Sequence, residues 1–270
     1  FLSTVSRADD APWREAMAAA RSAALAGNYL DAAQGYENAL QQAESFGKDN
    51  WRSASMRHDL GEVFRRLGRY EEAESELNGA LRGYQLAFGA DSPPSVNTIK
   101  QLALLYEAQG NEADAERYAH RALALAAKVF GDGDVRTAAA LGALAGLQAR
   151  RGLRAQAESS FRKALDFAAL QADANDPVAI SLRTSLCRGI ATLYIEMARF
   201  EDAQSWLDEA LSSGEKGADS GGNIDHADLA RTLLVKAFFE TQSGRMGQAL
   251  GSLERALALQ QSALGLQHIE

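Results

Sequence analysis

Residues Val96 to Thr137 read VNTIKQLALLYEAQGNEADAERYAHRALALAAKVFGDGDVRT, and this stretch decides the fold. Gly110 and Asn111 interrupt it near the middle, as turn residues do. Apolar residues recur on both sides of this interruption at the three- and four-residue spacing of a helix face. They are Ile99, Leu102, Ala103 and Tyr106 before the turn, and Ala115, Ala119, Ala122 and Leu123 after it. The stretch therefore predicts two helices joined by a short turn.

The same hairpin recurs along the whole chain. Aligned on Gly110, the turn is found again at Gly27, Gly68, Gly152, Ala198 and Gly244, so successive turns lie 41, 42, 42, 46 and 46 residues apart. A fixed period of this length is the signature of a repeat array. We therefore predict an all-α fold in which residues 12–270 form a single array, after a flexible segment at residues 1–11. The expected repeats are 12–50, 51–92, 93–134, 135–176, 177–222 and 223–270.

Three positions of the repeat carry only alanine or glycine. Such residues let two helices approach closely while a larger neighbour one turn away fills the gap. The position in the first helix (helix A) is Ala20, Gly61, Ala103, Ala145, Ala191 and Ala237. The two positions in the second helix (helix B) are Ala32, Ala73, Ala115, Ala157, Ala203 and Ala249, and Ala39, Ala80, Ala122, Ala164, Ala210 and Ala256. We expect all of them to be buried.

These matched positions resemble those of the tetratricopeptide repeat. The repeat length and the connections FGADSPPSV (residues 88–96) and IDHADLA (residues 224–230) resemble the longer kinesin-light-chain type. The resemblance covers nearly the whole chain, and it implies a right-handed α-solenoid whose A helices line a concave groove. The family often has asparagine at two helix A positions where this chain has Lys100 and Gln101. This departure from the family pattern affects the partner specificity that the resemblance implies.

The connections between repeats differ in composition. GADSPPS at residues 89–95 contains Pro93 and Pro94, which predict an extended path that ends the preceding helix. GDGD at residues 131–134 lacks the alternating oxygen ligands of a calcium loop, so we interpret it as a turn followed by a helix cap. Residues 171–177 lengthen one connection. SSGEKGADSGGN at residues 212–223 predicts a flexible linker.

Composition argues against several classes of function. The net charge of −8 is opposite to what a nucleic-acid binder or an anionic-membrane binder needs. Cys187 is the only cysteine, which excludes an internal disulfide, and we expect it to be a buried filler. The four histidines are scattered along the chain without metal-ligand spacing. We predict a non-enzymatic protein without cofactor, metal or membrane-spanning segment.

The inward positions of the A helices are the candidate binding site. Six of these positions are basic (Arg14, Arg21, Arg65, Lys100, Arg188 and Arg231) and two are acidic (Glu62 and Glu107), so they favour an acidic partner segment. Gly142 and Gly146 indicate either a bare floor for a ligand backbone or drift in an alanine-rich helix. The predicted groove residues are Arg65, Asn97, Lys100, Leu104, Glu107, Gly142, Gly146, Arg188, Thr192, Ile195, Arg231, Leu234 and Phe238.

Two functions are consistent with this pattern. The first is an adaptor that holds a peptide or helix of another protein in the groove. The alternative is a sensory or regulatory array that controls an output domain. We expect a cytoplasmic protein, although the start at Phe1 leaves removal of a signal peptide open. Residues 264–270, LGLQHIE, resemble a connection to another repeat, so we expect the natural chain to continue.

Overall fold

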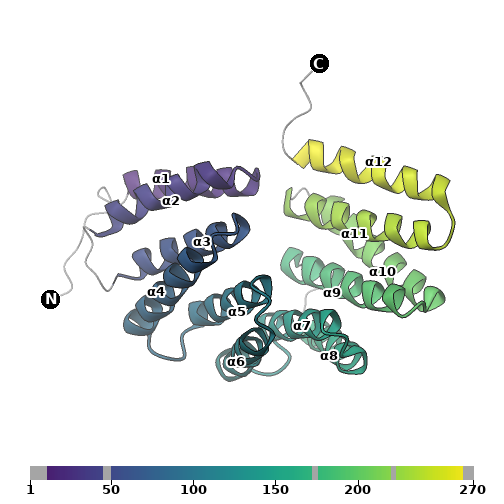
Figure 1. The fold of residues 1–270 in the computed structure, drawn as a ribbon, viewed down its shortest axis with the longest axis horizontal. Coiled ribbons are helices and arrows are strands. Elements are labelled where there is room, and N and C mark those ends of the chain that lie inside the picture. Colours follow the sequence, from purple (N-terminus) through teal and green to yellow (C-terminus); the bar gives the residue numbers. More distant parts are fainter. Residues whose placement is uncertain (1–10, 45–49, 172–175, 220–222, 264–270) are drawn as a thin grey trace, which may run out of the picture. The chain divides into compact units, whose positions relative to one another are not determined.

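The computed structural model of the chain describes residues 11–44, 50–171, 176–219 and 223–263. These residues form twelve α-helices and no strand, which confirms the all-α prediction (Figure 1). The expected flexible segment at residues 1–11 lies outside the described residues except for Ala11. The helices are α1 (Ala11–Leu25), α2 (Tyr29–Glu44), α3 (Trp51–Arg66), α4 (Tyr70–Phe88), α5 (Pro93–Ala108), α6 (Glu112–Phe130), α7 (Val135–Arg150), α8 (Arg154–Gln171), α9 (Pro177–Glu196), α10 (Phe200–Asp219), α11 (Asn223–Gln242) and α12 (Met246–Ala263).

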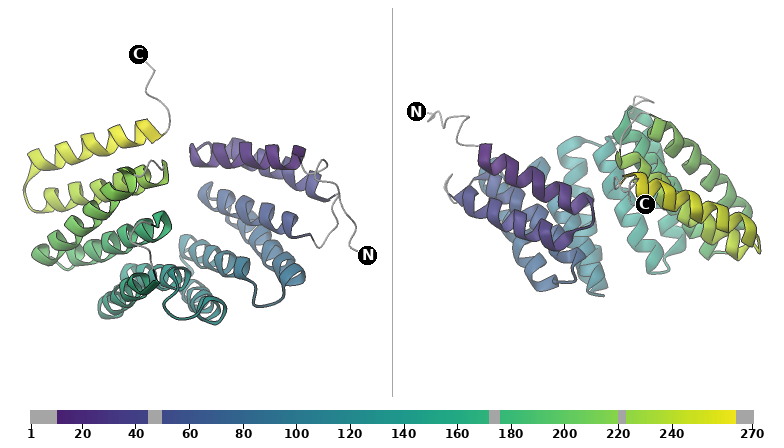
Figure 2. Two further views of the ribbon diagram at one scale, coloured as in Figure 1. Left: turned by 180° about the vertical axis from the view of Figure 1, so that it is seen from behind. Right: turned by 90° about the horizontal axis from the view of Figure 1, so that it is seen from above.

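The chain divides into two compact units, residues 1–129 and 130–270. Odd-numbered helices are the A helices and even-numbered helices are the B helices of six hairpins. In the first compact unit α3 packs against α2 and α4, and α5 packs against α4 and α3. In the second, α9 packs against α7, α8, α10 and α11, and α11 packs against α12 as well (Figure 2). The predicted continuity of all six hairpins in one right-handed array stays a prediction.

Each hairpin turns at the position that the sequence predicts. The backbone there adopts the left-handed conformation, with φ between 73° and 80° at the five glycines and 56° at Ala198. At Gly68 the amide donates to the Arg65 carbonyl, and the next amide donates to the Phe64 carbonyl. This pair of hydrogen bonds satisfies carbonyls that the end of a helix leaves without intrahelical partners.

The small residues lie where the helices cross. All eighteen of the alanine and glycine positions are buried, as predicted. Gly61 shows why size matters there, because a Cβ atom at this residue would lie 2.7 Å from Leu77 Cγ of α4. A larger side chain would separate α3 from α4. Cys187 is also fully buried, and the burial raises the pKa of its thiol to about 12.

The structure corrects three of the predicted connections. Pro93 and Pro94 do not form an extended linker, because they are the first residues of α5, where a missing amide hydrogen costs nothing. The preceding helix ends instead at Gly89, whose φ is 89°. Residues 224–230 belong to α11 and not to a linker. The predicted cap in residues 131–134 is confirmed, since the Asp134 carboxylate accepts from the Arg136 amide at 2.8 Å.

The third correction concerns residues 212–223, the predicted flexible linker. Helix α10 continues through this stretch to Asp219, and only residues 220–222 lie outside the described residues. Ser213 and Gly214 are buried, and a Cβ atom at Gly214 would lie 3.3 Å from Leu229 Cδ1 of α11. The absence of a side chain at Gly214 thus allows close packing, which outweighs the low helix propensity of the stretch.

Replacing Ala198 with glycine should raise the free energy of unfolding by about 1 kcal/mol, because a methyl group is strained at φ 56°. The matched control is Gly152→Ala at the same turn position of another hairpin. Nothing lies within 4 Å of a Cβ atom at Gly152, so only the backbone strain at φ 73° acts. Urea unfolding followed by circular dichroism should show opposite shifts for the two variants. Equal or same-sign shifts would contradict this explanation.

Candidate functional site

The predicted groove residues divide between the two compact units. Arg65 lies on α3, and Asn97, Lys100, Leu104 and Glu107 lie on α5, all in the first compact unit. The other eight lie in the second compact unit, on α7, α9 and α11. They are Gly142, Gly146, Arg188, Thr192, Ile195, Arg231, Leu234 and Phe238. We call these two surfaces the first and the second A-helix face and describe each by itself.

An ion pair on the first A-helix face neutralises Arg21. The Arg21 guanidinium donates to Asp59 Oδ2 at 3.0 Å, and the Asp59 side chain is only 19% exposed. Burial raises the pKa of Asp59, and the Arg21 charge opposes that rise. Arg21 is therefore held by its own chain, and it has little charge to offer a partner.

Glu62 occupies the middle of this face. Its carboxylate accepts from Arg66 at 2.9 Å and from the Gln101 side-chain amide at 3.2 Å. Nearby, His58 Nδ1 lies 3.0 Å from Thr98 Oγ1, and burial lowers the pKa of His58. These contacts fix α3 against α5.

Lys100 and Arg65 are the cations that this face leaves without an ion pair among the described residues. Burial lowers the pKa of Lys100, and only the more distant Glu62 charge supports the ammonium. Burial also lowers the pKa of Arg65, as does the neighbouring Arg66 charge, and Arg65 Nε is buried without a hydrogen-bond partner. A half-buried cation without a carboxylate is unfavourable, and an incoming anion would relieve that cost.

The remaining predicted residues of the first A-helix face surround these cations. Asn97 is exposed one turn before Lys100, while Leu104 and Glu107 are half-buried. Glu107 stabilises the charged form of Arg65 at longer range. The face thus combines a polar rim with one apolar side chain.

On the second A-helix face a buried carboxylate joins two of the predicted basic residues. Asp228 of α11 is 7% exposed, and its Oδ1 lies 2.7 Å from Arg231 Nη1 and 3.6 Å from Arg188 Nη2. Ser181 of α9 donates to Oδ2 at 2.5 Å. Arg188 and Ser181 therefore hold α9 to α11 through Asp228, and Arg231 pairs with the same carboxylate within α11. The two arginines do not present two free charges to a partner.

Four further predicted groove residues on this face make contacts within the chain. The side chain of Ile195 is only 5% exposed, so it belongs to the core. Thr192 donates its hydroxyl to the Arg188 carbonyl at 2.9 Å. Gly142 is no bare floor, because a Cβ atom there would overlap Leu186 Cδ2 of α9. Above Gly146 the space is taken by the Arg150 guanidinium, whose Nη1 lies 3.4 Å from the position of a Cβ atom.

Replacing Gly142 with leucine should lower the free energy of unfolding by about 1–3 kcal/mol, because the new side chain overpacks Leu186. Gly146→Leu is the matched control one turn later in α7, where the flexible Arg150 side chain can move aside and the loss should be below about 0.5 kcal/mol. Thermal unfolding of both variants measures the difference. Equal stability of the two variants would show that Gly142 is not required for packing against α9.

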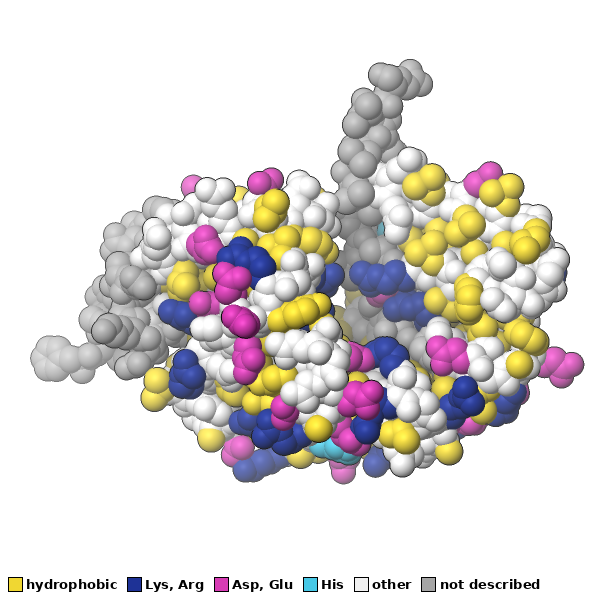
Figure 3. Space-filling model, in the orientation of Figure 1, with side chains coloured by type: hydrophobic (Ala, Val, Ile, Leu, Met, Phe, Trp, Pro, Cys, Tyr) yellow, Lys and Arg dark blue, Asp and Glu magenta, His cyan; other side chains and the backbone are white. Residues whose placement is uncertain are grey.

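The apolar positions Leu234 and Phe238 remain accessible. They lie one turn apart on α11 and are 42% and 49% exposed. On the face of the molecule shown in Figure 3, basic and acidic side chains lie next to one another over the first compact unit and form no large patch of one sign. Long-range attraction of a highly charged partner is therefore a weaker effect than local pairing at single cations.

Sequence reasoning missed Asp59 and Asp228, the carboxylates that neutralise the predicted basic residues. Asp59 lies beside an inward position, so the pattern of inward positions does not include it. Asp228 falls in the stretch predicted as a linker. It lies three residues before Arg231, and two side chains at this spacing can form an ion pair if the helix includes both, as α11 does. The described residues contain no group of three or more potential metal ligands. Every helix in the described part of the chain is too short or too polar to span a bilayer.

Solved structures with the same arrangement of helices include three relevant proteins. BtubC (BKLC) from P. vanneervenii has a TM-score of 0.66 and 18% identity, over 88% of this chain and 92% of that one. TPR-like repeats of a Podosopora anserina protein assigned as a kinesin light chain have a TM-score of 0.54 and 18% identity, over 76% and 93%. The Rap conjugation gene regulator of plasmid pLS20, in complex with the Phr* peptide, has a TM-score of 0.57 and 17% identity, over 99% and 79%. At these identities the similarity establishes the fold alone.

The family comparison agrees with the repeat pattern. A tetratricopeptide repeat model matches residues 14–85, 52–119 and 95–169, which together span more than half of the chain. A search of curated proteins found no match. The turns, the buried small residues and this match lead to one conclusion: the chain belongs to the tetratricopeptide repeat family.

Proposed function

We propose that the chain is a protein-interaction scaffold whose first A-helix face binds a peptide segment carrying acidic residues. The observation that carries this proposal is the pair of half-buried cations, Arg65 and Lys100, that have no ion pair with any described residue. A carboxylate of a partner would supply the missing charge, with Asn97 as a hydrogen-bonding neighbour. Leu104 would contact the apolar part of the same segment.

The fold supports a peptide as the partner. Tetratricopeptide repeats are interaction modules, and the structurally similar Rap regulator was solved with the Phr* peptide bound. The proposed acidic preference rests on the first A-helix face only. Arg188 and Arg231 share Asp228, so they contribute less than the sequence predicts.

A peptide-display selection on the immobilised protein tests the proposal. We expect the enriched peptides to contain acidic residues, and their affinity to fall as salt is raised. An Arg65→Gln, Lys100→Gln variant should bind the selected peptide at least about tenfold more weakly. The matched control, Arg82→Gln with Arg121→Gln, removes the same charge from exposed positions of α4 and α6 and should change affinity less than about twofold. Enrichment of neutral peptides, or equal affinities of the two variants, would refute the acidic preference.

A regulatory role is the second candidate, because the similar Rap protein is a gene regulator. Such a role requires that peptide binding changes the arrangement of the array. Small-angle X-ray scattering with and without the selected peptide would detect a change in the radius of gyration. An unchanged radius at saturation favours the adaptor.

A further inference from the structure

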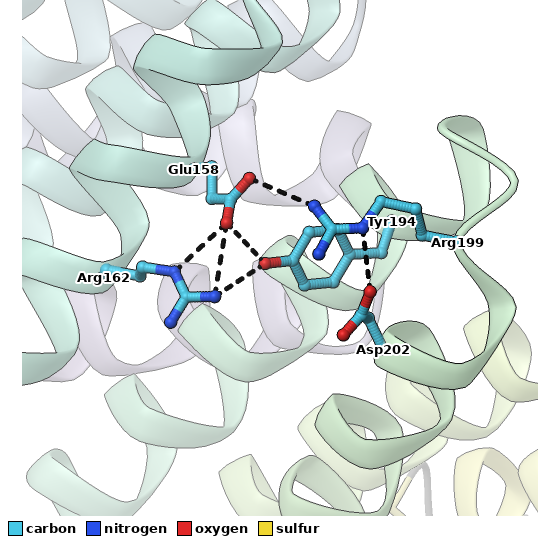
Figure 4. A network of polar contacts seen from close by, with 5 residues as sticks. All are labelled: Glu158, Arg162, Tyr194, Arg199 and Asp202. Carbon is cyan, nitrogen blue, oxygen red and sulfur yellow. Dashed lines mark hydrogen bonds and ion pairs between the residues drawn. The ribbon is translucent and has the colours of Figure 1, made fainter.

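A tyrosine contact recurs between neighbouring repeats. Tyr106 of α5 donates its hydroxyl to Glu74 Oε1 of α4 at 2.7 Å, and Tyr194 of α9 donates to Glu158 Oε1 of α8 at the same distance. Figure 4 shows the second contact, with Arg162 also hydrogen-bonded to the Tyr194 hydroxyl. Both tyrosines follow the small residue of their A helix by three positions. Their rings reach from one A helix to the B helix of the preceding repeat.

An arginine lies over the ring at this repeat position. The Arg199 guanidinium lies 4.3 Å from the centre of the Tyr194 ring (Figure 4). In the second repeat Arg69 lies 4.2 Å from the centre of Phe64, which occupies the same position as Tyr194. Both arginines directly follow the turn residue. The fold therefore has a recurring place for an aromatic ring beneath a cation, a favourable arrangement.

The sixth repeat keeps the arginine but lacks the ring. Glu240 stands at the position of Tyr194, Arg245 at that of Arg199, and Gln204 at that of Glu158. A cavity of about 430 Å³ lies here, and its lining includes Gln204, Leu233, Lys236, Glu240, Arg245 and Arg255. It is an open groove with a mostly polar lining, and its volume falls in the usual range for small-molecule sites. The cavity reaches Gln204, which stands at the position that the tyrosine hydroxyl contacts from the third and the fifth repeat.

The matching groove between the first two repeats shows the effect of the ring. Its cavity of about 380 Å³ is lined by Phe64 and by three carboxylates, Glu37, Glu72 and Glu76. Ala33, which corresponds to Gln204, is not part of that lining. Where the ring is present, the cavity still touches the preceding B helix at Glu37, Leu40 and Gln41, but it does not extend to the position of Gln204, and its acidic lining disfavours anions.

The charges of the sixth-repeat cavity favour an anion. Glu240 is 4% exposed, accepts from Ser252 Oγ at 2.7 Å and has Lys236 Nζ 3.8 Å away, so its charge is compensated within the wall. Arg245 lies over Phe239, and Arg255 is paired with the exposed Glu215 at 2.8 Å. Lys236 and Arg255 are thus paired within the chain, and Arg245 is the lining cation without an ion pair among the described residues. The Gln204 side-chain amide donates to Asp208 at 2.9 Å and has a second hydrogen that it can donate.

We propose that this cavity binds a small aromatic acid. Its ring takes the place that the Tyr194 side chain fills one repeat earlier, within reach of the Arg245 guanidinium. Its carboxylate lies toward Arg255 and toward Gln204, which stands where the other repeats place the carboxylate acceptor of the tyrosine hydroxyl. This site lies in the second compact unit, and it does not depend on the peptide proposed for the first A-helix face.

Binding of phenylacetate, followed by ligand-observed NMR and calorimetry, tests this site. Wild type should bind phenylacetate at least about tenfold more tightly than benzylamine, which carries the same ring with a positive charge. Glu240→Tyr restores the recurring ring, so it should abolish binding in a protein that still folds, which a cooperative thermal transition would confirm.

A matched pair of glycine variants provides the control. Gly251 lines the cavity and Gly247 does not, and nothing lies within 4 Å of a Cβ atom at either residue. Gly251→Leu should weaken phenylacetate binding at least about tenfold by filling the cavity, whereas Gly247→Leu should leave it within about twofold. The proposal is overturned if wild type does not bind phenylacetate at millimolar concentration. It is also overturned if Glu240→Tyr and Gly251→Leu bind as wild type does.

Discussion

Replacing Asp228 with asparagine should lower the free energy of unfolding by about 3 kcal/mol, because it leaves the buried Arg188 guanidinium without a counter-charge. The Arg188 side chain is 15% exposed, and burial already lowers its pKa despite the attraction of Asp228. Two further bonds hold the guanidinium in place, to the Asp228 carbonyl at 3.2 Å and to Thr232 Oγ1 at 3.3 Å. The cation therefore cannot move into water without breaking contacts between α9 and α11.

Glu209→Gln is the matched control for Asp228→Asn. Glu209 pairs with Arg183 at 2.7 Å in the same compact unit, but the two side chains are 42% and 53% exposed. Its loss should cost less than about 1 kcal/mol. A double variant, Asp228→Asn with Arg188→Met, should recover part of the stability by removing the buried cation. Similar losses for Asp228→Asn and Glu209→Gln in urea unfolding would contradict a special role of burial.

Replacing Tyr194 with alanine should cost about 3–5 kcal/mol, because it empties a fully buried aromatic position between α8, α9 and α10. Tyr194→Phe keeps the ring and should cost about 1–3 kcal/mol through loss of the bonds to Glu158 and Arg162. Thermal unfolding of the two variants separates packing from hydrogen bonding. Equal losses would mean that the ring itself contributes little.

The Tyr194→Phe effect should depend on pH. The Tyr194 hydroxyl lowers the pKa of Glu158 below its ordinary 4.5, followed by Arg162. A carboxylate with a lowered folded-state pKa stabilises the fold above its unfolded-state pKa, and that contribution is lost as pH falls through the folded-state value. The stability difference between wild type and Tyr194→Phe should therefore be constant near neutral pH and narrow below about pH 4.5. A difference that widens on acidification would contradict this linkage.

The repeat could be read from the sequence because its signals are local. A turn residue at Gly110 and small residues such as Ala103 and Ala115 mark every hairpin, and each acts through its own helix or its nearest neighbour. Residues 212–219 could not be assigned in this way. Their glycine and serine content favours a loop, whereas in the structure they extend α10, with Gly214 packed closely against α11.

The binding site could be predicted less well because charge and space depend on contacts distant in sequence. Arg188 is neutralised by Asp228, forty positions away. The sequence around Gly142 does not indicate whether the space beside this glycine is open or filled. In the structure Leu186 from α9 fills it. Lys100 and Arg65 could be identified as basic inward positions, but their lack of an ion pair emerges only from the packing of α3 and α5.

Photo-crosslinking of the selected peptide tests the central claim, that the partner lies on the first A-helix face. A photoreactive benzoylphenylalanine at Asn97, exposed one turn from Lys100 on α5, should crosslink to the peptide. The same group at Arg117, exposed on the B helix α6 of the same hairpin, should not. Crosslinking from residue 97 alone, suppressed by Lys100→Gln, is the result that we predict. Crosslinking from residue 117 alone, or equally from both positions, would contradict binding on the first A-helix face.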